Sequence, residues 1–501
     1  MTTVWIVRFS NACAILSALI LASASVFGQA DMGAIAGVVK DATSAVVADA
    51  KIVVTETLTN SERSTTSNNL GEYHVQNLTP GTYQVVVSKA GFQTYKATIE
   101  VAVGGHSTLV AQLIVGTGNT VVEVVAGAAT EVNTQTQELS QLIDAQQLAQ
   151  LPSLTRNPYD FVAISGNVSN GDTTSNGGLT ASGGGGQELS GRGVGYAING
   201  QRESGTEILL DGVENVSVFG AVVGEYVPLD AVQEYSVVTN NFSAEYGRAS
   251  GGVVNVTTKS GTNSWHGSAW EFNRLSGYTA NTFNNVANGL PKGVYTRNQF
   301  GFQVGGPIIK NKLFASESTE FTRVRSNSVQ TEEIFDPSFI SLLPANAQSY
   351  FTQFGVTKLP GTPVVTAGQL DADAAGGDPN GFSVNPINGV TAVGPDQPVF
   401  DQVNFTAPFN AGGGQPQNTY TLVGRLDYNP SEKTQMFFRL GRERDDFFEG
   451  TAFYSAYPQY DAGTLNQNQS YLLSVNHTFN SNLLNNTKLS FTRLNSITSY
   501  D

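Results

Sequence analysis

The sequence predicts a mainly β protein made of several β-rich units, and two observations support this. Only 13% of the 501 residues are charged, well below the roughly 25% of a typical soluble protein. Neutral polar residues and 53 glycines take their place. From about residue 264 onward, apolar and neutral polar residues alternate, which is the two-residue period of strands. A chain of this length is expected to form more than one domain.

Residues 1–30 are expected to be a secretory signal peptide. Arg8 supplies an early positive charge, Ala12 to Ala24 is apolar, and Ala30 offers a small residue at the cleavage point. A membrane anchor is the alternative, but this apolar run is shorter than the roughly 20 residues of a spanning helix. The single cysteine, Cys13, lies in this segment, so no disulfides are expected in the mature chain.

Two units are expected before the alternating region. Residues 31–116 carry short valine-rich runs separated by turns such as Thr79-Pro80-Gly81, which predicts a small β-sandwich. Residues 117–263 open with an extended stretch. A helical stretch follows from about Leu139 to Leu148, and Pro152 stops it. Glycine-rich loops and further strands follow, so this second unit is expected to be a compact α+β domain.

Residues 264–501 are expected to form the first strands of a transmembrane antiparallel β-barrel. Phe302 and Val304, for example, alternate with Gln299 and Gln303. A soluble sandwich also alternates, but its polar face is usually rich in Lys and Glu, whereas here it is mostly neutral. Long and short links between strands also alternate, as in outer-membrane barrels. Too few strands are present to close a barrel, so the sequence is expected to be the front part of a longer protein.

Four blocks carry a resemblance to a known family. They are "LGEYHVQNLTPGTYQVVVSKAGF", "LPSLTRNPYDF", "INGQRESGTEILLDGVENV" with "LDAVQEYSVVTNNFSAEYGRASGGVVNVTTKSGTN", and "FGFQVGGPIIKNKLF". In this order the chain resembles TonB-dependent outer-membrane receptors. The particular likeness is to the Oar-like group, with an N-terminal carboxypeptidase-regulatory-like domain of the carbohydrate-binding-like fold. The resemblance implies that residues 117–263 are the TonB-box region and the plug, and that residues 264–501 begin a truncated barrel.

The same resemblance implies where the plug ends. "GGVVNVTTK" would be its last strand, residues 260–263 the seam, and "WHGSAWEF" the first barrel strand. Val254 and Val256 are then expected inside the plug, and Trp270 and Phe272 are expected to face lipid.

By resemblance, a TonB box should precede the plug and add as a strand to the periplasmic energy transducer TonB. The candidate is "TVVEVV", which comprises Thr120, Val121, Val122, Glu123, Val124 and Val125. The alternative is an ordinary edge strand of the preceding sandwich. Arg192 and Arg248 lie in stretches that resemble the plug surface facing the barrel wall, and are candidates for plug–barrel contact. Solvated arginines beside glycine turns are the alternative.

No enzymatic activity and no cofactor are expected. The four histidines lack the spacing of a zinc site, and no phosphate loop or nucleophile elbow is present. Asp371, Asp373 and Asp378 are spaced like a loose calcium loop, but without the glycine and glutamate that an EF-hand requires. The net charge of −15 without a basic stripe argues against nucleic acid as a partner.

The expected function is that of a TonB-dependent receptor or transporter in the bacterial outer membrane. Its sandwich and plug would be periplasmic and its long loops extracellular, beside lipid and lipopolysaccharide. The ligand would be a glycan, siderophore or peptide. One alternative is an outer-membrane adhesion or surface-binding protein without transport. A secreted carbohydrate-active enzyme is the other, and it would need a soluble mature protein and paired catalytic carboxylates.

Overall fold

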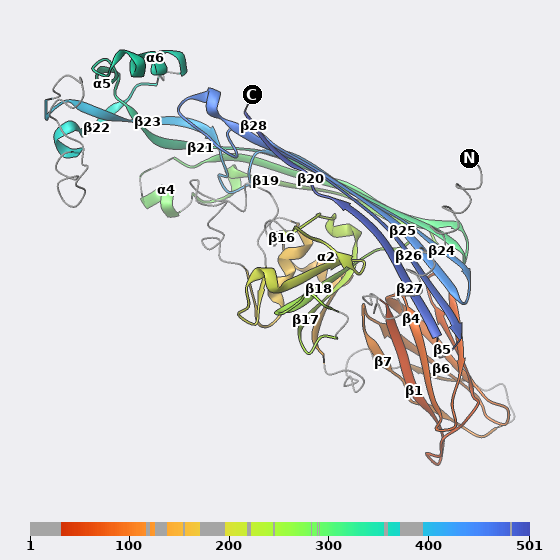
Figure 1. Cartoon of the computed structure of the whole chain (residues 1–501). Helices are drawn as coiled ribbons and strands as arrows, with labels where there is room; N and C mark the ends of the chain where they lie inside the picture. Colours follow the sequence, from red (N-terminus) through yellow and green to blue (C-terminus); the bar gives the residue numbers. More distant parts are fainter. Residues whose placement is uncertain are drawn as a thin grey trace, which may run out of the picture.

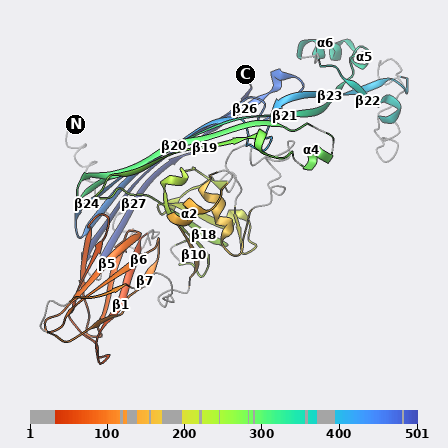
Figure 2. The ribbon, with the colours of Figure 1, turned by 180° about the vertical axis from the view of Figure 1, so that it is seen from behind.

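The structure is a computed structural model in which three β-rich units follow one another along the chain (Figure 1). A small sandwich comes first, a domain of strands and short helices, the middle domain, comes second, and a long curved sheet completes the chain. Figure 2 shows the middle domain under the concave side of the sheet and the sandwich at one end of the sheet. The described residues are 32–116, 121–125, 138–153, 156–170, 196–217, 222–243, 246–281, 283–287, 289, 291–354, 359–370, 394–480 and 483–500.

The sandwich consists of two sheets that share one apolar core. Alternate residues of its strands are buried, as in β5, where Tyr83, Val85 and Val87 are all covered. One sheet has the order β4-β1-β7 with β8 also on β1, and the other has the order β3-β2-β5-β6-β9. The strands are β1 (Gly33–Asp41), β2 (Lys51–Glu56), β3 (Glu62–Thr66), β4 (Glu72–Leu78), β5 (Gly81–Ser88), β6 (Thr94–Val101), β7 (His106–Thr108), β8 (Ala111–Leu113) and β9 (Val121–Val125).

The middle domain, residues 138–258 where described, is built on a five-stranded sheet of order β10-β17-β18-β13-β14. Val254 and Val256 of β18 are buried in its core, as expected from the sequence. Its strands are β10 (Leu139–Asp144), β11 (Val168–Asn170), β12 (Tyr196–Ile198), β13 (Thr206–Leu210), β14 (Val213–Glu214), β15 (Val216–Ser217), β16 (Val222–Val223), β17 (Val232–Asn240) and β18 (Gly252–Thr258). Its helical segments are α2 (Ala145–Gln150), η1 (Pro158–Ile164), η2 (Glu203–Gly205) and η3 (Leu229–Ala231).

The expected helix from Leu139 to Leu148 is wrong in its first half. Leu139–Asp144 is strand β10 and pairs antiparallel with β17. The helix begins only after Asp144, whose carboxylate caps it by accepting a hydrogen bond from the Gln147 amide. The apolar spacing fitted both structures, and pairing with a distant strand decided between them. The end of the helix before Pro152 is confirmed.

The curved sheet is an antiparallel meander with the order β19-β20-β21-β24-β25-β26-β27. β22 and β23 extend it beyond β21, and β28 pairs with β26. Its strands are β19 (His266–Leu275), β20 (Val294–Ile309), β21 (Leu313–Phe335), β22 (Thr362–Thr366), β23 (Pro398–Pro408), β24 (Gln417–Ser431), β25 (Thr434–Phe447), β26 (Ala462–Asn480), β27 (Leu483–Arg493) and β28 (Ser496–Tyr500). Its links carry η4 (Ser276–Tyr278), α4 (Phe283–Ala287), α5 (Pro337–Ile340), α6 (Ala345–Phe354) and η5 (Pro458–Tyr460).

The two faces of the curved sheet have the reverse of the usual polarity. The face toward the middle domain buries polar side chains, among them Gln299, Gln303 and Asn468. The opposite face exposes apolar ones such as Phe302 and Leu426. An apolar outer surface around a polar interior is the pattern of a transmembrane barrel.

The links of the sheet are short at one end and long at the other, as the sequence indicated. β20 and β21 are joined by residues 310–312, β24 and β25 by residues 432–433, and β26 and β27 by residues 481–482. The sandwich lies at this end, and α5 and α6 lie at the far end (Figure 1). Within the part of the chain that the structure describes, no helix combines the length and the apolar composition needed to cross a membrane.

The expectation that Trp270 and Phe272 face lipid is wrong. Trp270 pairs with Gly301, and its Nε1 donates a hydrogen bond to Glu320 on the concave face, with an N–O distance of 3.0 Å. Arg156 of the middle domain lies over both rings. The indole occupies the space that Gly301 leaves, since a Cβ there would lie 2.8 Å from a ring carbon of Trp270.

The inward position of Trp270 predicts weak quenching of its fluorescence by bromine-labelled lipid tails. In a Trp265→Phe protein, Trp270 is the single tryptophan after residue 30. Its emission in brominated-lipid vesicles should therefore stay close to that in unlabelled vesicles. A tryptophan introduced by Phe438→Trp on the exposed face, with Trp265 and Trp270 both changed to Phe, should be quenched strongly. Equal quenching of the two proteins would contradict the inward position.

Candidate functional site between the middle domain and the curved sheet

The contact between the middle domain and the curved sheet is centred on one buried acid, Asp211. Asp211 and Gly212 form the two-residue turn between β13 and β14, with φ of 53° and 71°. Asp-Gly suits such a hairpin because both positions need positive φ. The turn points the carboxylate of Asp211 at the sheet, where the side chain is fully buried.

Three basic residues from three strands of the sheet converge on this turn. Arg425 of β24 and Arg439 of β25 approach the Asp211 carboxylate with N–O distances of 3.3 and 3.2 Å. Lys488 of β27 donates to the backbone oxygen of Asp211 at 3.0 Å. Thr258 adds two donors, its amide and its hydroxyl, both at 2.9 Å from the carboxylate. A negatively charged side chain of the middle domain is thus paired with positively charged side chains of the sheet.

Arg425 is held in place by more than Asp211. Its guanidinium donates to Asp427 at 2.8 Å and to the backbone oxygen of Thr258 at 3.1 Å. It also lies over the ring of Phe437, 4.0 Å from the centroid. These contacts fix the orientation of a charge that is almost entirely removed from water, and buried charges need such partners to be tolerated.

A second ionic contact has the opposite arrangement of charge. Arg156 of the middle domain contacts Glu320 of β21 at 3.2 Å and Asp230 of its own domain at 2.5 Å. Its guanidinium also lies 4.1 Å from the ring centroid of Phe272. Arg156 therefore joins the middle domain to the first and third strands of the sheet.

A third contact depends on a glycine. Glu225 is buried against β25, and a Cβ on Gly441 would lie 2.3 Å from its Oε1. Burial raises the pKa of Glu225, and the positive charge of Arg439 opposes that rise. Next to it, the Tyr226 amide faces Glu443 at 3.4 Å, and Asn468 donates to Glu443 at 2.7 Å. The apolar part of the interface is small: Val423 of the sheet joins the core of the middle domain.

The sandwich is attached to both other units. The buried carboxylate of Glu234 in the middle domain accepts a hydrogen bond from the Val103 amide. Burial is the main cause that raises the pKa of Glu234 to about 7, and the Val103 hydrogen bond opposes it. On the other side, Arg63 donates to the backbone oxygen of Glu432 at 2.6 Å, and Leu58 accepts from the Asn263 amide at 2.9 Å.

The site residues predicted from the sequence lie away from the contacts described above or outside the described residues. Arg248 forms an ion pair with Glu214, also in the middle domain, and both side chains are about half exposed. The ion pair that the structure gives Arg248 thus lies inside one domain, while Asp211 and Arg156 reach the sheet. Arg192, Ala30 and the acidic residues Asp371, Asp373 and Asp378 lie outside the described residues. Among the residues that are described, no group of three or more His, Cys, Asp or Glu could hold a metal ion.

The TonB-box candidate is a strand in this structure. Val121–Val125 forms β9, which pairs in parallel with β6 from Thr94↔Val121 to Thr98↔Val125. It is the outermost strand of its sheet. The backbone therefore has the arrangement of the alternative expectation, an edge strand of the sandwich. Thr120 lies outside the described residues.

Comparisons with known proteins agree with this architecture. Residues 34–114 match the carboxypeptidase regulatory-like domain, and residues 257–501 match the outer membrane beta barrel domain. The chain is 27% identical over 367 residues to the TonB-dependent transporter Oar of Myxococcus xanthus. The match covers 67% of this chain and 32% of that protein, so the chain spans about a third of its relative's length.

Solved structures show a more distant likeness. The outer membrane transporter YddB of Escherichia coli is 12% identical with a TM-score of 0.43, over 72% of this chain and 40% of that one. The ferric enterobactin receptor PfeA of Pseudomonas aeruginosa is 14% identical with a TM-score of 0.41, over 72% and 42%.

The chain therefore combines a carboxypeptidase regulatory-like domain with an outer-membrane β-barrel domain, and its place is the outer membrane. Its resemblance to TonB-dependent outer-membrane receptors of the Oar-like group is confirmed.

Replacing Asp211 by Asn should loosen the middle domain from the sheet. The amide keeps the size of the side chain but leaves Arg425 and Arg439 buried without their shared carboxylate, a loss of about 3–5 kcal/mol in comparable sites. Limited proteolysis and thermal unfolding in detergent measure the effect. Glu214→Gln removes the exposed partner of Arg248 and should cost about 0–1 kcal/mol. Equal effects of the two substitutions would contradict the central role of Asp211.

The stability of the folded protein should fall as pH rises through the pKa of Glu234, because the buried carboxyl at the contact with the sandwich then ionises. Its pKa in the folded protein is about 7, above the ordinary 4.5. The folded state therefore holds the proton more tightly, so stability from this group is complete below pH 4.5 and is lost as pH rises through 7. Glu234→Gln should flatten the pH dependence of the unfolding temperature across this range. An unchanged slope would assign that dependence to other groups.

Proposed function

We propose that this protein is a TonB-dependent outer-membrane receptor or transporter. The middle domain is its plug, and the curved sheet is the first part of the barrel wall around it. Ligand binds at the long loops, and the energy transducer TonB moves the plug so that the ligand crosses the outer membrane. The short links and the sandwich then face the periplasm. The Myxococcus xanthus relative is named as a TonB-dependent transporter, and the proposal extends that function to this chain.

The observation that supports this most is the polar character of the plug–sheet contact. A permanent interface between two domains is usually apolar, whereas this one is made mainly by buried charges and hydrogen bonds around Asp211, Arg156 and Glu225. Water can replace each of these contacts as the plug leaves the wall, because every group involved is hydrated in the open state. An apolar interface would lose its free energy without any such replacement.

Residues 120–125 are the segment that we propose for the transducer. As the outermost strand of its sheet, β9 pairs with β6 along one edge, and no strand among the described residues pairs with its other edge. TonB binds by strand addition, which needs only backbone groups. It can add to the open edge of β9, or it can pair with the segment after this has left β6.

A disulfide across β6 and β9 should decide between these two routes. Lys96 and Glu123 are Cα partners, and the chain has only one cysteine, Cys13. Lys96→Cys with Glu123→Cys should therefore form one disulfide under oxidation. If TonB needs β9 released, the oxidised protein should not bind the periplasmic domain of TonB in a pull-down, and reductant should restore binding.

Two controls keep this experiment decisive. Thr55→Cys with Glu62→Cys crosslinks β2 to β3, which are Cα partners away from β9, and should leave TonB binding intact. Deletion of residues 120–125 should abolish binding. If the reduced protein does not bind TonB, or if the deletion has no effect, the transducer role of this segment is refuted. Binding by the oxidised protein would indicate addition to the open edge.

An adhesion or surface-binding protein without transport is the second candidate, and the far end of the sheet favours it. Tyr350 and Phe354 of α6 are exposed, with ring centroids 4.9 Å apart. Tyr460 from another link is exposed as well. Exposed aromatic side chains are typical of binding surfaces. Surface binding that survives deletion of residues 120–125 would favour adhesion, whereas transport requires them.

A further inference from the structure

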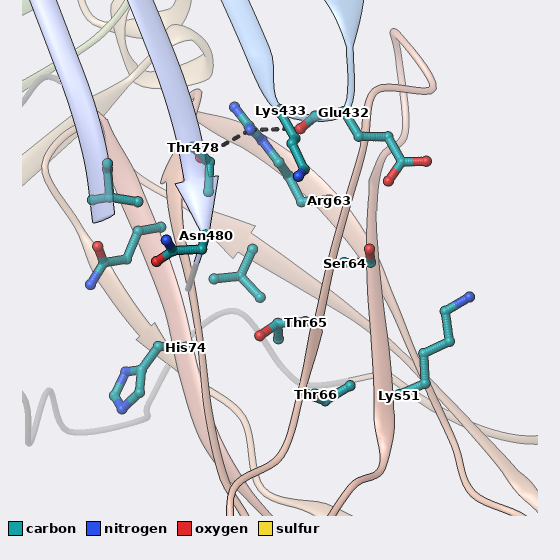
Figure 3. Close-up of a pocket in the computed structure, with 13 residues that line it drawn as sticks. Lys51, Arg63, Ser64, Thr65, Thr66, His74, Glu432, Lys433, Thr478 and Asn480 are labelled. Carbon is teal, nitrogen blue, oxygen red and sulfur yellow. Dashed lines mark hydrogen bonds between the residues drawn. The ribbon is translucent and has the colours of Figure 1, made fainter. Parts of the chain in front are cut away.

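A cavity of about 450 Å³ lies where the sandwich meets the short links of the sheet (Figure 3). It opens between β3 and β4, which are the end strands of the two sandwich sheets. Thr478 and Asn480 of β26 and the link between β24 and β25 close the other side. Its volume is in the range of small-molecule sites, and none of the contacts proposed for TonB lies in it.

The lining is basic in a protein whose net charge is −15. Lys51, Arg63, Lys433 and His74 contribute to it, against one carboxylate, that of Glu432. Figure 3 shows Lys433 and Arg63 in the part of the lining near Thr478, with Thr65 and Thr66 lower in the view. Cations that line one cavity favour an anion in it, because an anion offsets the repulsion between them.

Arg63 is the residue of the cavity lining that most requires a further hydrogen-bond acceptor. Its side chain is only 6% exposed. Nη1 donates to the backbone oxygen of Glu432 at 2.6 Å and to the Thr478 hydroxyl at 3.3 Å, while Nε and Nη2 have no acceptor among the residues that the structure describes. Nε and Nη2 form the edge of a guanidinium that binds two oxygens of one oxyanion in parallel. Both atoms are buried, and Arg63 lines the cavity, so an anion that enters the cavity beside Arg63 can supply the acceptor.

We propose that this cavity binds a phosphate group, either on a small solute or on a lipid headgroup. Arg63 holds two of its oxygens through Nε and Nη2, and Lys433 neutralises the remaining charge. Thr65, which lies on the same face of β3 as Arg63, donates its hydroxyl group to the rest of the ligand. The site joins the sandwich to the barrel, so an occupied cavity also stabilises the attachment of the sandwich.

Thermal unfolding and calorimetry of the purified full-length protein test this proposal. Inorganic phosphate and glycerol 1-phosphate are the soluble probes, with chloride at equal ionic strength as the control. Phosphatidylglycerol that remains bound through purification, detected by native mass spectrometry, is the lipid probe. Binding of the soluble probes assigns the site to a solute, and retained lipid assigns it to a headgroup.

Two substitutions tie the binding to this cavity. Arg63→Gln should abolish phosphate binding or lipid retention. Because Arg63 also contacts Glu432, Lys433→Gln provides a variant on an exposed link, and it should weaken binding about two- to fivefold, as for an exposed charge. Lys89→Gln makes the same charge change near Asp49, outside the cavity lining, and should have no effect. The proposal is overturned if chloride matches phosphate and no lipid is retained, or if Lys433→Gln and Lys89→Gln behave alike.

Discussion

Water is excluded from the contact between the middle domain and the wall of the sheet, yet most of the groups there are polar. This constraint governs the rest of the structure. A charge in such a place is tolerated only if a counter-charge or several hydrogen bonds replace its hydration. Asp211 meets this requirement for two arginines at once, and Arg156 and Glu320 meet it for each other. The position of the domain is therefore set by pairing of polar groups rather than by apolar packing, since Val423 is the one residue of the sheet in the apolar core of the middle domain as far as the chain is described.

The alternation in the sheet could be predicted because two different surroundings impose it on every strand. Phe302 and Val304 face outward and Gln303 faces inward, so a one-residue slip would exchange all of them. For Trp270 the alternation predicts the wrong face of the sheet. An aromatic residue in an alternating strand was expected to face lipid, but its side is fixed by pairing with Gly301 and by the acceptor on Glu320. Neither Gly301 nor Glu320 can be identified as a partner of Trp270 from the residues next to it in the sequence.

The centre of the interface could not have been found from spacing. Asp-Gly at positions 211 and 212 is a recognisable hairpin turn, and a turn alone predicts only a change of direction. Its basic partners lie more than 200 residues later, on strands where they occupy inward positions like any neutral residue. An arginine among Gln, Ser and Asn on a buried face is the signal that was available, because an inward charge requires a partner. The sequence indicates Arg192 and Arg248 instead, because the stretches around them resemble a plug surface.

The strand pairing of Val121–Val125 bears on how force would pass through the molecule. If the transducer pulls on this segment, β6 is its first attachment, and the sandwich takes up the load before the plug does. The sandwich is itself joined to the plug through Val103 and Glu234 and to the sheet through Arg63 and Glu432. One of these attachments depends on the protonation of a carboxyl and the other ends at the cavity proposed for phosphate. Both attachments are polar, and the one to the sheet includes further hydrogen bonds such as Arg63 to Thr478 and Gln435 to Ser61. Polar contacts of this kind can be released without unfolding the apolar core of either domain.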